Sequence, residues 1–236
     1  MKSGFKFFIF VLILGIGAAL LLSSDLFNIK NIYVTGNKSV PKNEIIQLSS
    51  IQYDQNIFRL NRKRIIKNIF QNPKIKAVRM KRVLPSSIAL DIIEREGFAL
   101  IPYLGSYITI DEETVILEVI SLDNNLNLPI VNGITFSDFK LGEELKSENK
   151  EQLSIVMDIL QHLKSVEMTE LIETIDVEDT SNIIITTKSD VRIYLGNNNF
   201  NYKIRMAKSI LEDLNKKMET GIIDMRHDGS PVFKRD

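Results

Sequence analysis

The hydrophobic positions of the chain form three successive patterns. An uninterrupted apolar run comes first, from Phe7 to Leu22. In residues 27–95, apolar positions alternate along some stretches and recur at helical spacing along others. From Phe98 onward, short alternating runs are joined by two longer segments with helical spacing. Alternation is typical of half-buried strands, and recurrence at i, i+3 and i+4 of amphipathic helices. The sequence therefore predicts an α+β protein behind one apolar segment.

The apolar run is predicted to be a retained transmembrane anchor over residues 7–24. As a helix, its sixteen residues cover roughly 24 Å of a hydrocarbon core about 30 Å thick. A cleaved signal peptide is the alternative, and it requires small residues one and three positions before the cut. Cleavage near Ser23 or Ser24 would place a leucine at the more distant of these positions, which favours retention.

The charges beside this run predict its orientation. Lys2 and Lys6 precede it, and the first charged residue after it is Asp25. Lysine and arginine are enriched on the cytoplasmic side of membrane helices. Residues 1–6 are therefore predicted to be a cytoplasmic tail, and everything after Leu26 is predicted to lie outside the cytoplasm.

Residues 27–95 are predicted to run strand, helix, helix, strand, strand. Ser39 and Asn61 precede the two helical patterns as N-cap candidates, and Asn72-Pro73 ends the second helix. The predicted elements are a strand from Phe27 to Asn37, a helix after Ser39, a helix from Asn61 to Phe70, and strands from Ile75 to Val83 and from Ser87 to Glu94.

The remainder of the chain is predicted to consist of short strands and two helices. Helical spacing is found from Asn149 to Lys164 and from Asn201 to Lys217. The strands are predicted at Tyr107 to Ile110, Val115 to Leu117, Ile172 to Val177, Asn182 to Thr187, Val191 to Leu195 and Gly221 to Arg226. Gly221 to Arg226 is the last clear strand in the pattern.

Composition excludes several classes of chemistry. The chain has 236 residues, with 30 basic and 30 acidic residues and no cysteine. This length suits two domains of about a hundred residues each. The lack of cysteine excludes disulfides, thiolate metal sites and thiol catalysis.

The sequence contains no residue pattern that is typical of an enzyme. His162 and His227 do not have the spacing of a zinc-binding H-E-x-x-H motif, and no nucleophile or phosphate-binding glycine motif follows a predicted strand. The acidic turn Asp111-Glu112-Glu113 is predicted to be solvated, whereas acid–base catalysis needs burial to separate pKa values. We therefore expect a non-enzymatic protein without a cofactor or metal.

One segment has a strongly biased charge. Arg59 to Arg82 contains ten basic residues and no acidic residue. Lys63, Arg64 and Lys67 in this segment form a candidate basic patch facing the membrane or a partner. The alternative is that these side chains are only the solvated face of a helix. Nucleic acid is not expected as a partner, because the segment is predicted to lie outside the cell and has no aromatic stacking platform.

Residues 25–97 resemble a POTRA domain of the type found in the FtsQ/DivIB cell-division family. The resemblance is carried by Ile29 to Asn37, Asn56-Ile57-Phe58, Asn72-Pro73, Leu84 to Ser87 and Glu94-Arg95, in this order behind one anchor. Residues 98–236 are similar to the second extracytoplasmic domain of the same family, a mixed β-domain with flanking helices. The matching residues there are Leu128-Pro129 with Gly133, Leu195-Gly196 before a helix containing Lys203, and Ile223 to Arg226.

The resemblance implies a single-pass protein of the bacterial divisome that scaffolds and regulates septal cell-wall synthesis. Its implied partners are FtsB/DivIC-like and FtsL-like coiled-coil proteins and a septal peptidoglycan synthase, at the cell membrane and division septum. The implied contact is the edge of the last strand, because an unpaired edge can receive another strand. The implied partner-binding residues are Ile223, Met225, Arg226, His227, Gly229 and Ser230.

Two questions stay open at this point. Arg226 is the candidate for a contact with a partner carboxylate, and the alternative is a rim residue without a specific pair. The alternative function is that of a POTRA-containing component of envelope transport or assembly. Such proteins usually carry several of these modules or a membrane barrel, and the sequence has no series of strands typical of a barrel.

Overall fold

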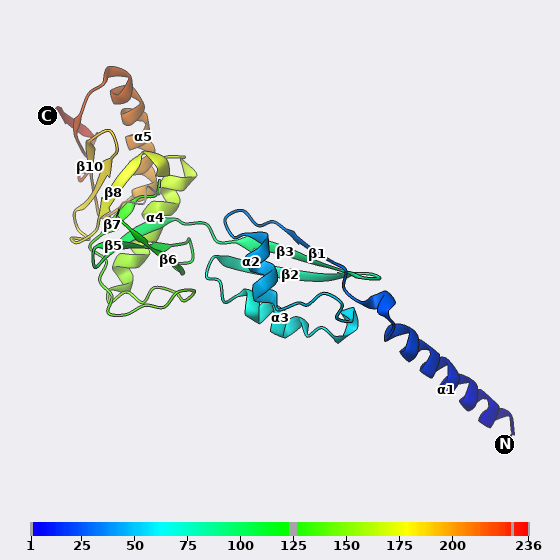
Figure 1. Cartoon of the computed structure of the whole chain (residues 1–236). Coiled ribbons are helices and arrows are strands. Elements are labelled where there is room, and N and C mark those ends of the chain that lie inside the picture. The colour runs from blue at the N-terminus through cyan, green and yellow to red at the C-terminus, as the bar shows by residue number, and fades with distance from the viewer. Residues whose placement is uncertain (1, 123–126, 228, 236) are drawn as a thin grey trace. The chain divides into compact units, whose positions relative to one another are not determined.

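The computed structural model describes residues 2–122, 127–227 and 229–235, and it confirms the predicted α+β fold class. The chain divides into two compact units, Met1–Arg95 and Glu96–Asp236 (Figure 1). The first unit begins with helix α1 (Lys2–Leu22). Gly4–Leu22 of this helix is long and apolar enough to cross a membrane, and none of it is buried by the rest of the protein. The helix therefore has the length and the uncovered apolar surface that lipid contact requires.

The first unit continues with a three-stranded sheet and two helices. Its elements are β1 (Asn31–Thr35), α2 (Lys42–Ser49), α3 (Arg62–Ile69), β2 (Ile75–Val83) and β3 (Ser87–Glu94), with short 3-10 turns at Asp25–Phe27 and Ile57–Arg59. This is the predicted order of strand, helix, helix, strand, strand. The sheet order is β1-β3-β2, with β1 parallel and β2 antiparallel to the central strand β3. Figure 1 shows α2 and α3 together beside this sheet.

The capping and the apolar spacing predicted for α3 are observed. The Asn61 side chain accepts a hydrogen bond from the Arg64 backbone N–H at 3.1 Å, which satisfies one of the free donors at the helix start. Ile65 and Ile69 are buried in one cluster with apolar residues of β3. Phe70, which was predicted to belong to the buried face, is 46% exposed because the helix ends at Ile69.

The start of α2 differs from its prediction. Pro41 is at the cap position, and Ser39 does not cap the helix. The Ser39 backbone N–H and hydroxyl instead donate to the Glu94 carboxylate, as does the Val40 N–H. Burial acts to raise the pKa of Glu94, but these hydrogen bonds outweigh it and the pKa is lowered. Ser39 therefore joins the segment before α2 to the end of β3.

The first strand is shorter than predicted. β1 begins at Asn31, and Asp25–Phe27 forms a 3-10 turn that connects α1 to the sheet. Phe27 packs edge-on against Phe58, with ring centroids 5.1 Å apart. The alternating pattern that begins at Phe27 thus includes apolar residues of a turn, which period-two spacing alone does not distinguish from a strand.

The second unit is a nine-stranded mixed sheet with two long helices. Its strands are β4 (Ala99–Tyr103), β5 (Ser106–Ile110), β6 (Ile116–Ser121), β7 (Ile130–Asn132), β8 (Ile172–Asp176), β9 (Ile183–Thr187), β10 (Val191–Gly196), β11 (Gly221–Asp224) and β12 (Val232–Arg235). The helices are α4 (Lys150–Ser165) and α5 (Phe200–Lys217), with a 3-10 turn at Thr169–Leu171. The sheet order is β12-β11-β10-β9-β8-β7-β4-β5-β6. Apolar residues of α4 and α5 share one core with the strands.

The end of this sheet corrects the expectation that Gly221 to Arg226 is the last strand. β11 ends at Asp224, and β12 pairs antiparallel with it, so that Ile223 is opposite Phe233. β11 is therefore an interior strand between β10 and β12, and β12 is the edge. The four residues of β12 are too few for periodicity to identify a strand.

The acidic turn after β5 is also different from its prediction. Asp111 is buried, and its carboxylate accepts hydrogen bonds from the backbone N–H groups of Glu113 at 2.9 Å and Val115 at 2.8 Å. A carboxylate that accepts N–H groups two and four residues ahead holds the backbone in a turn. Asp111 thus has a structural role that its adjacent acids do not indicate.

Candidate functional site

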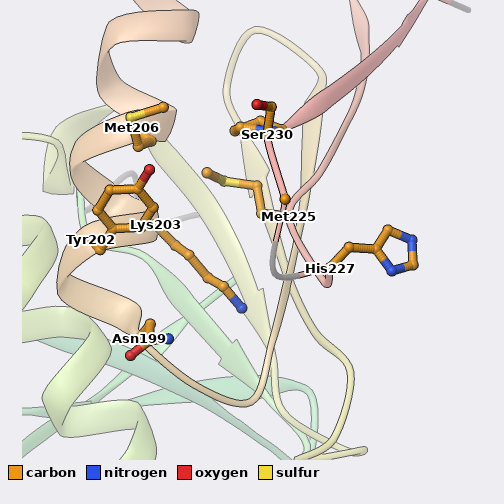
Figure 2. A pocket seen from close by; sticks show the side chains of 9 residues that line it. Asn199, Tyr202, Lys203, Met206, Met225, His227 and Ser230 are labelled. Carbon is orange, nitrogen blue, oxygen red and sulfur yellow. The ribbon is translucent and has the colours of Figure 1, made fainter.

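The candidate site is a cavity of about 410 Å³ at the end of the second unit where β11 and β12 meet α5 (Figure 2). One wall comes from the start of α5, namely Asn199, Tyr202, Lys203 and Met206. The other wall comes from the connection between the strands, namely Met225, His227, Gly229, Ser230 and Pro231. Two segments separated in the sequence by the rest of α5 and by β11 therefore form one concave surface beside the sheet edge.

The structure brings four of the six predicted partner-binding residues to this cavity. Met225, His227, Gly229 and Ser230 line it. In Figure 2 the Met225 side chain points toward α5, whereas the His227 ring points away from that helix. Met225 is only 3% exposed, so it forms the floor of the cavity rather than a projecting contact.

Ile223 and Arg226 do not line the cavity. Ile223 is fully buried in the core, and β12 pairs with the edge of β11 on which the expectation relied. The prediction that β11 itself offers an exposed edge is therefore wrong. Whether any of the six residues contacts a partner stays a prediction, and β12 is the strand at this end of the sheet whose outer backbone has no neighbouring strand among the described residues.

Arg226 forms a specific pair within the chain. Its Nε and one terminal nitrogen donate to the two Asp224 carboxylate oxygens at 2.9 and 2.6 Å, and its guanidinium lies over the Tyr194 ring. Hydrogen bonding to Arg226 is the main reason why the pKa of Asp224 is lowered to about 2, against the opposing effect of burial. The pair holds the Arg226 guanidinium at the end of β11, where the Arg226 side chain is 39% exposed.

Lys203 is the cavity residue with the most unusual environment. It is 6% exposed, and its Nζ donates to the Leu195 carbonyl and to Asn198 Oδ1, both at 2.8 Å. A buried ammonium needs such acceptors, because it cannot leave the protein interior to be hydrated. Lys203 therefore fixes the start of α5 to the end of β10 and shapes one wall of the cavity.

Sequence reasoning did not predict that α5 contributes to the site. Lys203 follows Leu195-Gly196 in the helix that carries the family resemblance, and this was the signal available for it. Tyr202 is 62% exposed although it is a large aromatic residue. Its exposure is visible only once the position of α5 against the sheet is known.

The basic patch is in the other unit. Lys63, Arg64 and Lys67 are exposed on α3, and Lys63 and Lys67 lie one turn apart on the same side of the helix. Arg64 is in the first turn of α3, where its backbone N–H donates to the Asn61 side chain. The structure thus gives these residues an accessible position without identifying what they contact.

The described residues do not suggest a metal centre. Within residues 2–122, 127–227 and 229–235, no group of three His, Cys, Asp or Glu side chains is close enough to hold a metal ion. His162 is paired with Asp158 on α4, with 3.3 Å between Nε2 and the carboxylate oxygen. This pair joins residues four apart on a helix surface, an arrangement that stabilises helices.

Comparison with known protein families gives two matches in the order of the two units. Residues 27–95 match the POTRA domain of FtsQ type, and residues 99–226 match the C-terminal domain of cell division protein FtsQ/DivIB. The second match covers more than half of the chain and ends at Arg226, so β12 lies beyond it.

Similar proteins match over nearly the whole chain. Cell division protein DivIB of Clostridium botulinum strain Hall is 28% identical over 227 residues, which are 95% of this chain and 88% of that protein. DivIB of Clostridium tetani is 29% identical over 226 residues, with 94% and 84% covered. Cell division protein FtsQ of Syntrophotalea carbinolica is 25% identical over 206 residues, with 87% and 72% covered. Both units therefore belong to the region that these proteins share.

Proposed function

Because this chain belongs to the FtsQ/DivIB family of non-enzymatic cell division proteins, we propose that it scaffolds and regulates septal cell-wall synthesis by binding other single-pass division proteins. In this proposal residues 7–24 anchor the chain with residues 1–6 in the cytoplasm. The POTRA domain (residues 25–97) and the β-domain (residues 98–236) lie outside the cytoplasm, at the division septum. Membership of the family implies partners among the division proteins. The assignment of particular partners and contact residues rests on the cavity and the strand beside it.

The observation that supports this function best is the combination of an edge strand with a cavity. β12 closes the sheet, and the cavity begins at Pro231, directly before it. An incoming extended segment can pair with the backbone of an edge strand, and a pocket beside the strand can select among the side chains that the segment carries. β12 and the cavity together offer both elements of such recognition.

The proposed partners are FtsB/DivIC-like and FtsL-like coiled-coil proteins, with a septal peptidoglycan synthase as a further partner. The exposed residues Arg226, His227, Gly229 and Ser230 are next to the edge, and we assign the direct contacts to them and to β12. A guanidinium has five N–H donors, so Arg226 can bind Asp224 and still contact a partner carboxylate. Ile223 and Met225 support this surface from beneath.

Localisation and capture test the proposal together. A tagged full-length chain should form a band at midcell and should co-purify with the DivIC-like and FtsL-like proteins of the same organism. A uniform envelope signal without capture of these proteins would contradict the divisome role and would favour a component of envelope transport or assembly.

The basic patch is proposed as a second contact, with anionic lipid or an acidic partner surface. Replacing Lys63, Arg64 and Lys67 by glutamine should weaken binding of the full chain's extracytoplasmic domains to anionic vesicles, and salt should weaken binding of the parent protein in the same way. Replacing the exposed lysines Lys216 and Lys217 of α5 is the matched control. Binding that neither salt nor the triple substitution changes would contradict the lipid contact.

A further inference from the structure

The end of the first unit that is nearest to α1 carries apolar side chains without a protein cover. Leu26 is 55% exposed, Phe58 41%, Val83 46% and Leu84 59%. We name these four residues the membrane-proximal rim. They come from three separate segments, namely the 3-10 turn after α1, the turn before α3, and the tip of the β2–β3 hairpin. Exposed apolar residues from several segments at one end of a domain indicate a surface that another apolar phase covers.

A hydrogen bond from a buried side chain joins the rim to the end of α1. Asn56 is 8% exposed, its Nδ2 donates to the Leu22 carbonyl at 2.8 Å, and its Oδ1 accepts from the Phe58 N–H at 2.9 Å. Leu22 is the last residue of the apolar helix, whose final carbonyls have no partner within the helix. Phe58 is two residues from Asn56, which limits its Cα to about 7 Å from that of Asn56. Phe58 therefore lies near the end of α1.

The hairpin tip is held at the same end of the domain. Arg82 Nε donates to the Ile57 carbonyl at 2.9 Å, and the backbone N–H of Lys30 donates to the Ser86 carbonyl at 2.8 Å. Val83 and Leu84 lie between these two attachment points. The register of β1 against β3, in which Asn31 is opposite Ser87, places the start of β1 and the hairpin turn together, as Figure 1 shows.

We propose that the membrane-proximal rim inserts into the interface of the bilayer that holds α1, as a second membrane contact beside the anchor. The interfacial layer on each side of the hydrocarbon is about 5–8 Å thick, so side chains within one turn of the end of α1 reach it. Leucine and aromatic side chains gain free energy by entering this layer. The rim docks the first unit onto the membrane and limits its rotation about α1.

Charges around the rim favour an anionic surface. The basic residues Lys30, Arg59, Lys81 and Arg82 are close to rim residues in the sequence. The acidic residues there are Asp25 and Asp54, so basic residues outnumber acidic ones. Basic residues at the membrane surface attract anionic lipids over distances of about a Debye length. The occupant that fits the rim is therefore a bilayer containing anionic lipid, and a protein partner is the competing occupant that the experiment must exclude.

The absence of tryptophan from the whole chain allows a direct test. Single-tryptophan variants Phe58→Trp and Leu84→Trp of the full chain are reconstituted into vesicles of phosphatidylcholine and phosphatidylglycerol. Emission is compared with that in vesicles whose acyl chains are brominated, which quench tryptophan only on contact. Ile93→Trp is the matched control, because Ile93 is 56% exposed in the same domain but lies toward the other end of the β2–β3 hairpin.

The proposal predicts that brominated lipid quenches most of the emission of both rim variants and shifts their unquenched emission to shorter wavelength than that of Ile93→Trp. Rim variants that behave like Ile93→Trp would overturn it, and would assign the rim to a protein partner. The inference rests on the proposed anchoring by α1, and Phe10→Trp within α1 separates the two. Quenching of Phe10→Trp alone overturns only the rim, whereas an unquenched Phe10→Trp overturns the anchor as well.

Discussion

The two sheets of this protein each end in an outer strand with exposed basic residues, and the difference between these two edges is what lies beside the strand. The outer strand β2 of the first sheet carries exposed Lys76, Arg79 and Lys81 along its length. Charged side chains along an edge oppose the addition of another strand. The outer strand β12 of the second sheet has only four residues, of which Lys234 and Arg235 are also exposed, and a cavity of about 410 Å³ begins directly before it. An unpaired outer backbone and exposed charge are thus common to both edges, and β12 combines them with an adjacent pocket that can select a side chain.

The largest expected effect tests the burial of the β11 side chain Ile223 against the exposure of Val232 on β12. Ile223→Asp places a carboxylate in the core without a partner, and it should lower the free energy of unfolding of the second unit by about 3–5 kcal/mol. Val232→Asp changes a side chain that is 47% exposed on β12, and it should cost no more than about 0.5 kcal/mol. Denaturant unfolding of the full chain in detergent, followed by circular dichroism, measures both. Equal and small losses for the two variants would contradict the burial of Ile223 in the core of the second unit.

A smaller effect is expected from the Asp224–Arg226 pair that ends β11. Because the pKa of Asp224 is lowered to about 2, the stability from this pair is complete above its unfolded pKa and is lost as the pH falls toward 2. Asp224→Asn should remove this pH dependence and cost about 1–2 kcal/mol at neutral pH, allowing for the exposure of Arg226.

The matched control for this pair is Asp213→Asn on α5. Asp213 also pairs with a basic residue, Lys217 at 2.6 Å, but both side chains are more than half exposed. Screening by solvent should make its removal nearly neutral. An acid titration of unfolding that is the same in the parent protein and in Asp224→Asn would contradict the assigned role of the pair.

The smallest effects compare the two units through their helix caps. Asn61 caps α3 in the first unit, and Asn149 caps α4 in the second, each by accepting a backbone N–H at 3.1 Å. Replacement of either by alanine should cost about 1 kcal/mol. Asn61→Ala should affect amide exchange only in the first unit and Asn149→Ala only in the second. Loss of protection in both units from one substitution would show that they do not unfold separately.

Patterns of sufficient length made much of this fold predictable. The strands Ile75–Val83 and Ser87–Glu94 were predicted with the bounds that the structure has, because eight or nine alternating residues leave little freedom of interpretation. The Asn61 cap was predictable because Asn61 directly precedes the helical spacing of α3, where its side-chain oxygen reaches a free backbone N–H of the first turn. Local physics thus determines these elements.

The site was less predictable because it depends on contacts between distant segments. Ser39 has the chemistry of a cap, yet it donates to Glu94 at the end of the neighbouring strand β3, which is 55 residues away in the sequence. Val232 to Arg235 show no period of their own, and they become a strand because β11 supplies the partner backbone. The cavity forms between the start of α5 and residues 225–227 and 229–231, and neither segment has a feature that indicates the other.

Removal of β12 tests the central claim most directly. A full-length chain that lacks residues 232–236 should lose at least about tenfold in affinity for the DivIC-like partner, which corresponds to 1.4 kcal/mol. Val119→Asp on β6, the strand at the opposite edge of the same sheet, is the control and should bind as the parent protein does. Binding is measured by titration in detergent, with circular dichroism to show that both variants are folded. Undiminished binding by the folded chain without β12 would contradict recognition at this edge.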